Sequence, residues 1–123
     1  MHIKRGADML TLVRLEPPPE DDSPQWKPWH DTVLATCQRV IDTGDDLCID
    51  VQNIRSPSSL LLGLFSRIQA QAGRDIGVSG LNAHWREVLR ITHMDRLLTI
   101  REPYETSNGR IVVMGHGAAS GEE

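Results

Sequence analysis

Serines gather in one short polar stretch of this chain. Residues 53–59 read Asn-Ile-Arg-Ser-Pro-Ser-Ser, and an apolar helical pattern begins directly after them. We call this stretch the serine turn. The start of a helix carries a partial positive charge and unpaired N–H groups, so it stabilises a phosphate group. The chemistry that these residues suggest is phosphorylation of a serine hydroxyl as a regulatory mark.

The residues alone leave two accounts of the serine turn open. In the first account, Ser56 is the N-cap of the helix, Pro57 is its first residue, and Ser58 and Ser59 are polar residues of its first turn. In the second account, the Ser59 hydroxyl is exposed, and a phosphate on it repels an acidic partner without unfolding the domain. Arg55 would either bind such a phosphate or be an ordinary solvated loop residue.

Two leucines at the start of this helix lie off its core stripe. The stripe runs through Leu61, Leu64 and Phe65, whereas Leu60 and Leu62 fall beside it. Exposed leucines next to a complete core stripe would indicate an interaction surface. The other possibility is that the N-terminal segment buries this helix more broadly.

The sequence contains no recognisable arrangement of catalytic residues. Asp50 is a single carboxylate at a strand end, and no Cys/His or Ser/His/Asp arrangement has a local signature. The five histidines never recur at zinc-ligand spacing, so we expect neither a metal nor a cofactor. Cys37 and Cys48 are expected to be buried, reduced thiols.

Composition narrows the classes of partner. A net charge of −4 gives no basic footprint for nucleic acid. No apolar run is long enough to insert into a membrane, and no apolar stretch follows the basic N-terminus, which predicts a cytoplasmic protein. The length of 123 residues fits one domain. We expect that domain to span residues 1–114 and to be followed by a disordered tail over residues 115–123.

Apolar periodicity predicts the elements that position the serine turn. Strands are expected over residues 9–15, 47–51, 76–79, 97–100 and 110–114. Helices are expected over residues 26–41, from about 58 to 72, and after a capping Asn82. Because Pro28 is tolerated only in a first turn, the regular part of the first helix should begin near Trp29 or His30. The alternation predicts an α/β fold, with a four- or five-stranded, mixed but mainly parallel sheet and helices packed on it.

Three blocks of the sequence resemble one known family. They are residues 47–54 (Leu-Cys-Ile-Asp-Val-Gln-Asn-Ile), residues 61–68 (Leu-Leu-Gly-Leu-Phe-Ser-Arg-Ile) and residues 79–100. Within the last block, Val-Leu-Arg-Ile-Thr-His-Met-Asp-Arg-Leu is similar to a hallmark run of the STAS family, which is named for sulphate transporters and anti-sigma-factor antagonists. The resemblance covers residues 46–101 and implies a STAS-like fold, although the final helix that usually closes that fold has no counterpart here.

The resemblance also assigns a role to one serine. Antagonists of the family read Asp-Ser-Ser-Gly-Leu-Gly at this helix start, and a partner kinase phosphorylates the first serine. Aligned on Asp50 and Gly63, the chain places Ser59 at the phosphoserine and Ser58 at the preceding Asp. Leu61 stands where the family has its first Gly.

The function implied by this resemblance is that of a non-enzymatic regulatory module. Its protein partner would be an anti-sigma-factor kinase or a related stress-signalling protein, with Ser59 as the candidate phosphoacceptor. The expected partner-binding residues are Asn53, Arg55, Ser56, Ser58, Leu60, Leu62 and Gly63. The alternative is a degenerate, non-phosphorylated STAS scaffold subunit in a signalling or lipid-transport assembly.

Overall fold

One parallel β-sheet organises the molecule. The computed structural model describes residues 10–102 and 110–114. The strands are β1 (Leu10–Leu15), β2 (Asp46–Asp50), β3 (Ile76–Ser79), β4 (Leu98–Ile100) and β5 (Arg110–Met114). They lie side by side in the order β4-β3-β2-β1-β5, and every pairing is parallel. The predicted α/β fold with a four- or five-stranded, mainly parallel sheet is therefore confirmed, and the sheet is parallel throughout rather than mixed.

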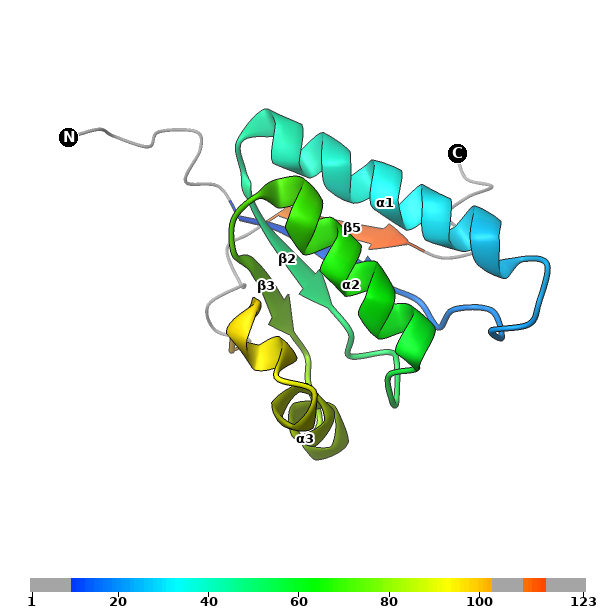
Figure 1. Cartoon of the computed structure of the whole chain (residues 1–123). Coiled ribbons are helices and arrows are strands. Elements are labelled where there is room, and N and C mark those ends of the chain that lie inside the picture. The colour runs from blue at the N-terminus through cyan, green and yellow to red at the C-terminus, as the bar shows by residue number, and fades with distance from the viewer. Residues whose placement is uncertain (1–9, 103–109, 115–123) are drawn as a thin grey trace.

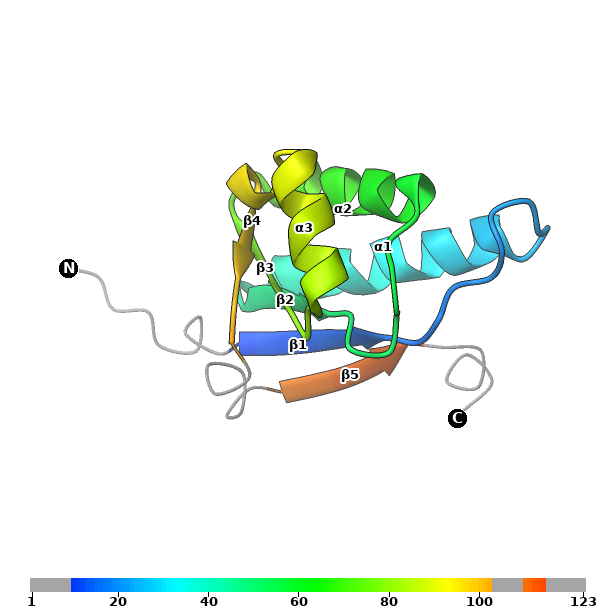
Figure 2. The same cartoon turned by 90° about the horizontal axis from the view of Figure 1, so that it is seen from below.

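Three α-helices connect the first four strands. They are α1 (Trp26–Thr43), α2 (Ser59–Ala72) and α3 (Ala83–Ile91), and a short 3₁₀ helix, η2 (Met94–Arg96), precedes β4. Each connection moves to the next strand in the same direction, so right-handed crossovers place all three helices on one face of the sheet. Figures 1 and 2 show this one-sided arrangement, which is compatible with a STAS-like fold.

The helix-covered face of the sheet holds the core. Side chains alternate along each strand, so Leu47 and Ile49 of β2 join the core cluster while Cys48 and Asp50 point to the other face. The core is closed around α3 by Trp85, whose ring stacks on Phe65 with centroids 5.9 Å apart and an angle of 16° between the planes.

The first helix begins earlier than predicted. The sequence places its regular start near residue 29 or 30, but α1 begins at Trp26, after Gln25. Pro28 is then the third residue of the helix. The N–H groups of the first turn have no partner inside a helix, so a proline there removes no hydrogen bond. The earlier start brings Trp26 and Lys27 onto the helix and, as described below, beside α2.

Other ends agree closely with the sequence. Gly73 closes α2 in the left-handed conformation, with φ 67°, and Asn82 caps α3 by accepting a hydrogen bond from the Trp85 N–H at 2.8 Å. Strand β4 begins at Leu98, one residue later than predicted. The expected tail over residues 115–123 lies outside the described residues.

Candidate functional site

The serine turn is fastened to α3. Ile54, the second residue of the turn, is buried, and its carbonyl accepts a hydrogen bond of 2.7 Å from the Trp85 indole N–H. The neighbouring carbonyl of Arg55 accepts a 2.9 Å hydrogen bond from the Asn82 side chain. Two consecutive carbonyls of the turn are thus held by the start of α3. This anchoring fixes where the chain leaves the turn and enters α2.

Ser58 is the N-cap of α2. Its backbone is extended (φ −104°, ψ 165°), and its hydroxyl oxygen accepts a hydrogen bond from the Leu61 N–H at 3.1 Å. The first account of the turn, with Ser56 as the N-cap and Pro57 as the first helical residue, is therefore wrong. Both of these residues precede the helix, and Ser56 is exposed.

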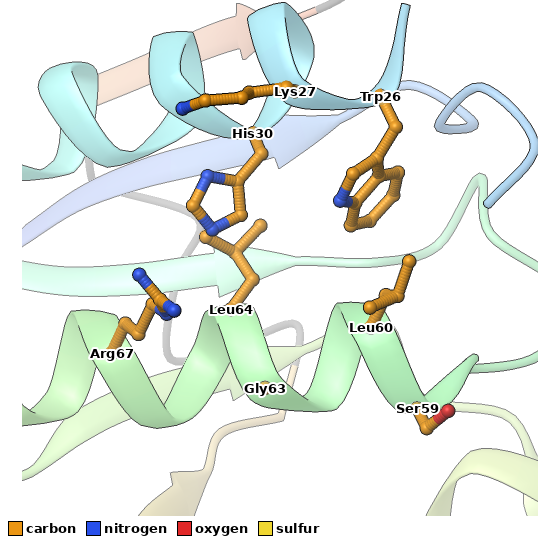
Figure 3. Close-up of a pocket in the computed structure, with 8 residues that line it drawn as sticks. All are labelled: Trp26, Lys27, His30, Ser59, Leu60, Gly63, Leu64 and Arg67. Carbon is orange, nitrogen blue, oxygen red and sulfur yellow. The ribbon is translucent and has the colours of Figure 1, made fainter. Parts of the chain in front are cut away.

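Ser59 is the first residue of α2, and its side chain is exposed. Within the described residues its hydroxyl forms no hydrogen bond, in contrast to the capping hydroxyl of Ser58. Figure 3 shows this hydroxyl at the end of α2 farthest from Arg67 and pointing away from His30. A group attached to it would meet solvent and the positive end of the helix dipole, not the core.

Leu60 and Leu62 do not form one surface. Leu60 is 41% exposed, whereas Leu62 is half-buried and packs against the core. Residues two positions apart on a helix are separated by roughly 200° of rotation about its axis, so the two side chains project from different sides of α2. Leu60 faces α1. Ser66, four residues after Leu62, instead contacts Met94 of η2 at 3.7 Å, which places Leu62 toward η2. The two leucines therefore lie on different sides of α2, and of this pair only Leu60 is exposed. A partner contact that uses both leucines stays a prediction.

The other residues predicted to bind a partner are spread along the turn. Asn53 is exposed and donates to a Glu16 carboxylate oxygen at 3.3 Å. Arg55 is exposed, and its guanidinium forms no hydrogen bond or ion pair within the described residues. Gly63 is exposed one turn after Ser59, and a β-carbon built on it would meet no atom within 4 Å. It therefore borders open space.

Open space lies between α1 and α2, which pack side by side (Figure 1). A groove of about 350 Å³ lies between the N-terminal parts of the two helices. Its lining residues, labelled in Figure 3, are Trp26, Lys27 and His30 from α1 and Ser59, Leu60, Gly63, Leu64 and Arg67 from α2. Leu60, Gly63 and Arg67 recur at i, i+3 and i+7, which is one face of a helix. The groove therefore joins three predicted site residues to basic and aromatic residues of α1 and α2.

Sequence reasoning missed most of this groove. Trp26 falls on the apolar stripe of α1, but the structure leaves it half-buried, with its ring centroid 5.3 Å from that of Trp29. The signal available in the sequence was the i, i+4 spacing of Trp26 and His30. That spacing gains meaning only once α1 is known to pack beside the start of α2.

Positive charge collects along the groove. Lys27 and His30 both contact Asp31, at 2.9 Å and 3.1 Å, on the solvent side of α1. The hydrogen bond from Lys27, followed by the one from His30, lowers the pKa of the Asp31 carboxyl below its usual value. Arg67 forms no ion pair within the described residues, and no Asp or Glu lines the groove. Lys27 and His30 thus share Asp31 as an acidic partner, whereas Arg67 faces the groove with no acidic partner among the described residues.

Asp50 serves the backbone of the turn. One carboxylate oxygen accepts a 2.8 Å hydrogen bond from the Gln52 N–H, and the other lies 3.4 Å from Arg14. Gly80 packs against the same carboxylate with φ 76°, and a β-carbon there would lie 2.7 Å from it. Asp50 is buried on the sheet face opposite the helices. Its contacts give it a structural role in shaping the entry to the serine turn.

Within residues 10–102 and 110–114, no three His, Cys, Asp or Glu side chains come together in a way that would hold a metal ion. None of the described helices combines the length and the apolar character needed to cross a bilayer.

The chain was compared with protein-family models, curated proteins and solved structures, and none of them matches it. A function must therefore be inferred from the fold, the serine turn and the groove.

Proposed function

We propose that this protein is a non-enzymatic regulatory binding module of the STAS type, switched by phosphorylation of Ser59. Its partner would be an anti-sigma-factor kinase or a related signalling protein. One observation carries the proposal: neighbouring serines have different tasks. Ser58 caps α2 through its hydroxyl, while the exposed Ser59 hydroxyl forms no hydrogen bond within the described residues. A hydroxyl without a structural task can be modified at no cost to the fold.

A phosphate on Ser59 would act on the partner and not on the domain. It adds about −1.5 to −2 charges at the N-terminus of α2, where the helix dipole stabilises negative charge. The Ser58 cap and the two carbonyl contacts from α3 stay in place. The domain therefore keeps its structure, while the exposed Leu60 acquires a doubly charged neighbour. A partner that covers Leu60 with apolar or acidic groups would be released.

Exposure to the cognate kinase tests the switch. The chain is incubated with the kinase and ATP, alongside Ser59→Ala and the matched control Ser56→Ala. Mass spectrometry should find one phosphate on the unmodified chain and on Ser56→Ala, and none on Ser59→Ala. No phosphate on any of the three, under conditions that label a known antagonist, would overturn the phosphorylation proposal.

A scaffold that is never phosphorylated is the second candidate. The chain has Ser58 and Leu61 where the antagonists of the family have Asp and Gly, and Leu61 is fully buried in the core. The groove and the exposed Leu60 need no phosphate to bind a partner. Partner capture that is equal for the unmodified chain, Ser59→Ala and Ser59→Glu would favour this scaffold over the switch.

A further inference from the structure

We infer that the groove between α1 and α2 binds a short acidic segment of a protein partner, one that carries an apolar anchor side chain. The inference rests on the proposed function, because it names the chemistry of the partner that the module would hold. The occupant follows from charge. The chain as a whole has a net charge of −4, yet the groove is lined by Lys27, His30 and Arg67 and by no carboxylate. An acidic segment is complementary to such a surface.

The cations of the groove are available to a ligand. Arg67 is exposed and forms no ion pair within the described residues, and its planar guanidinium suits bidentate binding of a carboxylate. The Lys27 side chain is 81% exposed, and its contact with Asp31 is an exposed i, i+4 pair. Exposed pairs of this kind are weak, so the ammonium can turn toward a carboxylate in the groove.

Apolar surface at the end of the groove nearer Ser59 selects the anchor. Leu60 is 41% exposed, and Figure 3 shows it facing the half-buried ring of Trp26 across the groove. Gly63 lies beside Leu60 with open space where a side chain would stand. The volume of about 350 Å³ is at the lower end of the range for small-molecule sites. It suits one or two inserted side chains, with acidic neighbours reaching the basic side chains toward the Arg67 end of the groove.

Ser59 lines the end of this groove farthest from Arg67. Its phosphate would place negative charge where an acidic segment enters, and like charges brought together at an interface weaken binding. The same site therefore accounts for capture by the unmodified chain and release by the phosphorylated one.

Gly63 allows filling of the groove to be separated from loss of stability. A β-carbon at this position meets nothing within 4 Å, and leucine has a higher helix propensity than glycine. Gly63→Leu should therefore fold at least as stably as the parent chain while occupying the space of the anchor. A loss of binding in this variant, with an unchanged or raised melting temperature, is not explained by unfolding.

The experiment titrates the full chain with a fluorescently labelled peptide of alternating glutamates and leucines, followed by anisotropy at low salt. A peptide with glutamine in place of every glutamate is the chemical control. Arg67→Glu turns an attraction into a repulsion and should weaken binding roughly tenfold. Arg96→Glu, the same charge change at an exposed residue of η2, is the matched control and should leave binding unchanged. Gly63→Leu should abolish binding, and Ser59→Glu should weaken it.

Several outcomes would overturn the inference that the groove binds an acidic segment. These are equal binding of the glutamine peptide, equal effects of Arg67→Glu and Arg96→Glu, full binding by Gly63→Leu, or binding to phosphatidylserine vesicles without binding to the peptide. A failure of the proposed switch looks different. In that case Arg67→Glu and Gly63→Leu still weaken binding, while Ser59→Glu binds as the parent chain does.

Discussion

Serine-to-alanine changes in the serine turn should separate structure from regulation. Ser58→Ala removes the hydroxyl that accepts from the Leu61 N–H at 3.1 Å, so one N–H of the first helical turn loses its protein partner. Ser59→Ala removes a hydroxyl that has no hydrogen bond within the described residues. Ser56→Ala changes an exposed residue outside the helix. The three variants make the same chemical change at positions only one to three residues apart.

The expected magnitudes follow from these contacts. Loss of a serine N-cap costs about 1 kcal/mol of unfolding free energy, within a range of about 0.5 to 2. For a domain of this size, about 1 kcal/mol lowers the melting temperature by roughly 4 °C. Ser59→Ala should leave the free energy of unfolding unchanged or raise it by up to about 0.5 kcal/mol, because alanine is the better helix former. Ser56→Ala should stay within about 0.5 kcal/mol of the parent chain.

Urea unfolding monitored by circular dichroism is the assay. With an m-value of about 1–3 kcal/mol/M, the midpoint of Ser58→Ala should fall by roughly 0.3–1 M while the slope stays constant. The midpoints of the other two variants should match the parent chain within error. A cost for Ser56→Ala equal to that for Ser58→Ala would restore the first account of the turn. A cost of about 1 kcal/mol or more for Ser59→Ala would refute the assignment of Ser59 as a residue without a structural task.

Two further substitutions and one chemical treatment test the packing around the serine turn and in the core. Gly80→Ala should destabilise the fold by more than about 1–2 kcal/mol, because φ is 76° and the new β-carbon would lie 2.7 Å from Asp50; thermal unfolding measures it, and a neutral effect would contradict this packing. Trp85→Phe keeps an aromatic ring but leaves the buried Ile54 carbonyl without its donor, which should cost about 1–3 kcal/mol and speed backbone amide exchange in the serine turn. Burial raises the pKa of the Cys37 thiol to about 12, so this thiol stays protonated and should resist alkylation at pH 8 until the protein unfolds; rapid labelling of the native protein would show that it is accessible.

Elements with local signals could be predicted well from the sequence. The end of α2 at Gly73 and the cap of α3 at Asn82 depend on residue types that act within one turn of the chain. The α/β class and the mainly parallel sheet follow from the alternation of strands and helices together with right-handed crossovers. These features need no knowledge of distant contacts, which is why the fold class could be predicted.

The N-cap of α2 depends on distant contacts. Ser56 followed by Pro57 is a common helix start, and local preference favours it. In the structure, Trp85 holds the Ile54 carbonyl from 31 residues away, and Asn82 holds that of Arg55 from 27 residues away. These contacts keep the turn non-helical beyond Ser56. Tertiary structure therefore selects Ser58 as the N-cap over the Ser56 cap that local sequence rules favour.

The groove illustrates the same limit at a larger scale. Its basic and aromatic residues lie on two helices that begin 33 residues apart, at Trp26 and Ser59. Periodicity shows which side chains share a face of one helix, but not which faces of two helices meet. The pair of Leu60 and Leu62 shows the converse case, because neighbours in sequence lie on different sides of α2.

The site of phosphorylation in the native cell tests the central claim most directly. The protein is isolated under conditions that preserve phosphate, and the fragment spanning the serine turn is sequenced by mass spectrometry. The account predicts a phosphate on Ser59 and none on Ser58, whose hydroxyl caps α2. A phosphate on Ser58 or Ser56, or a turn without phosphate both when the partner is bound and when it is released, would contradict it.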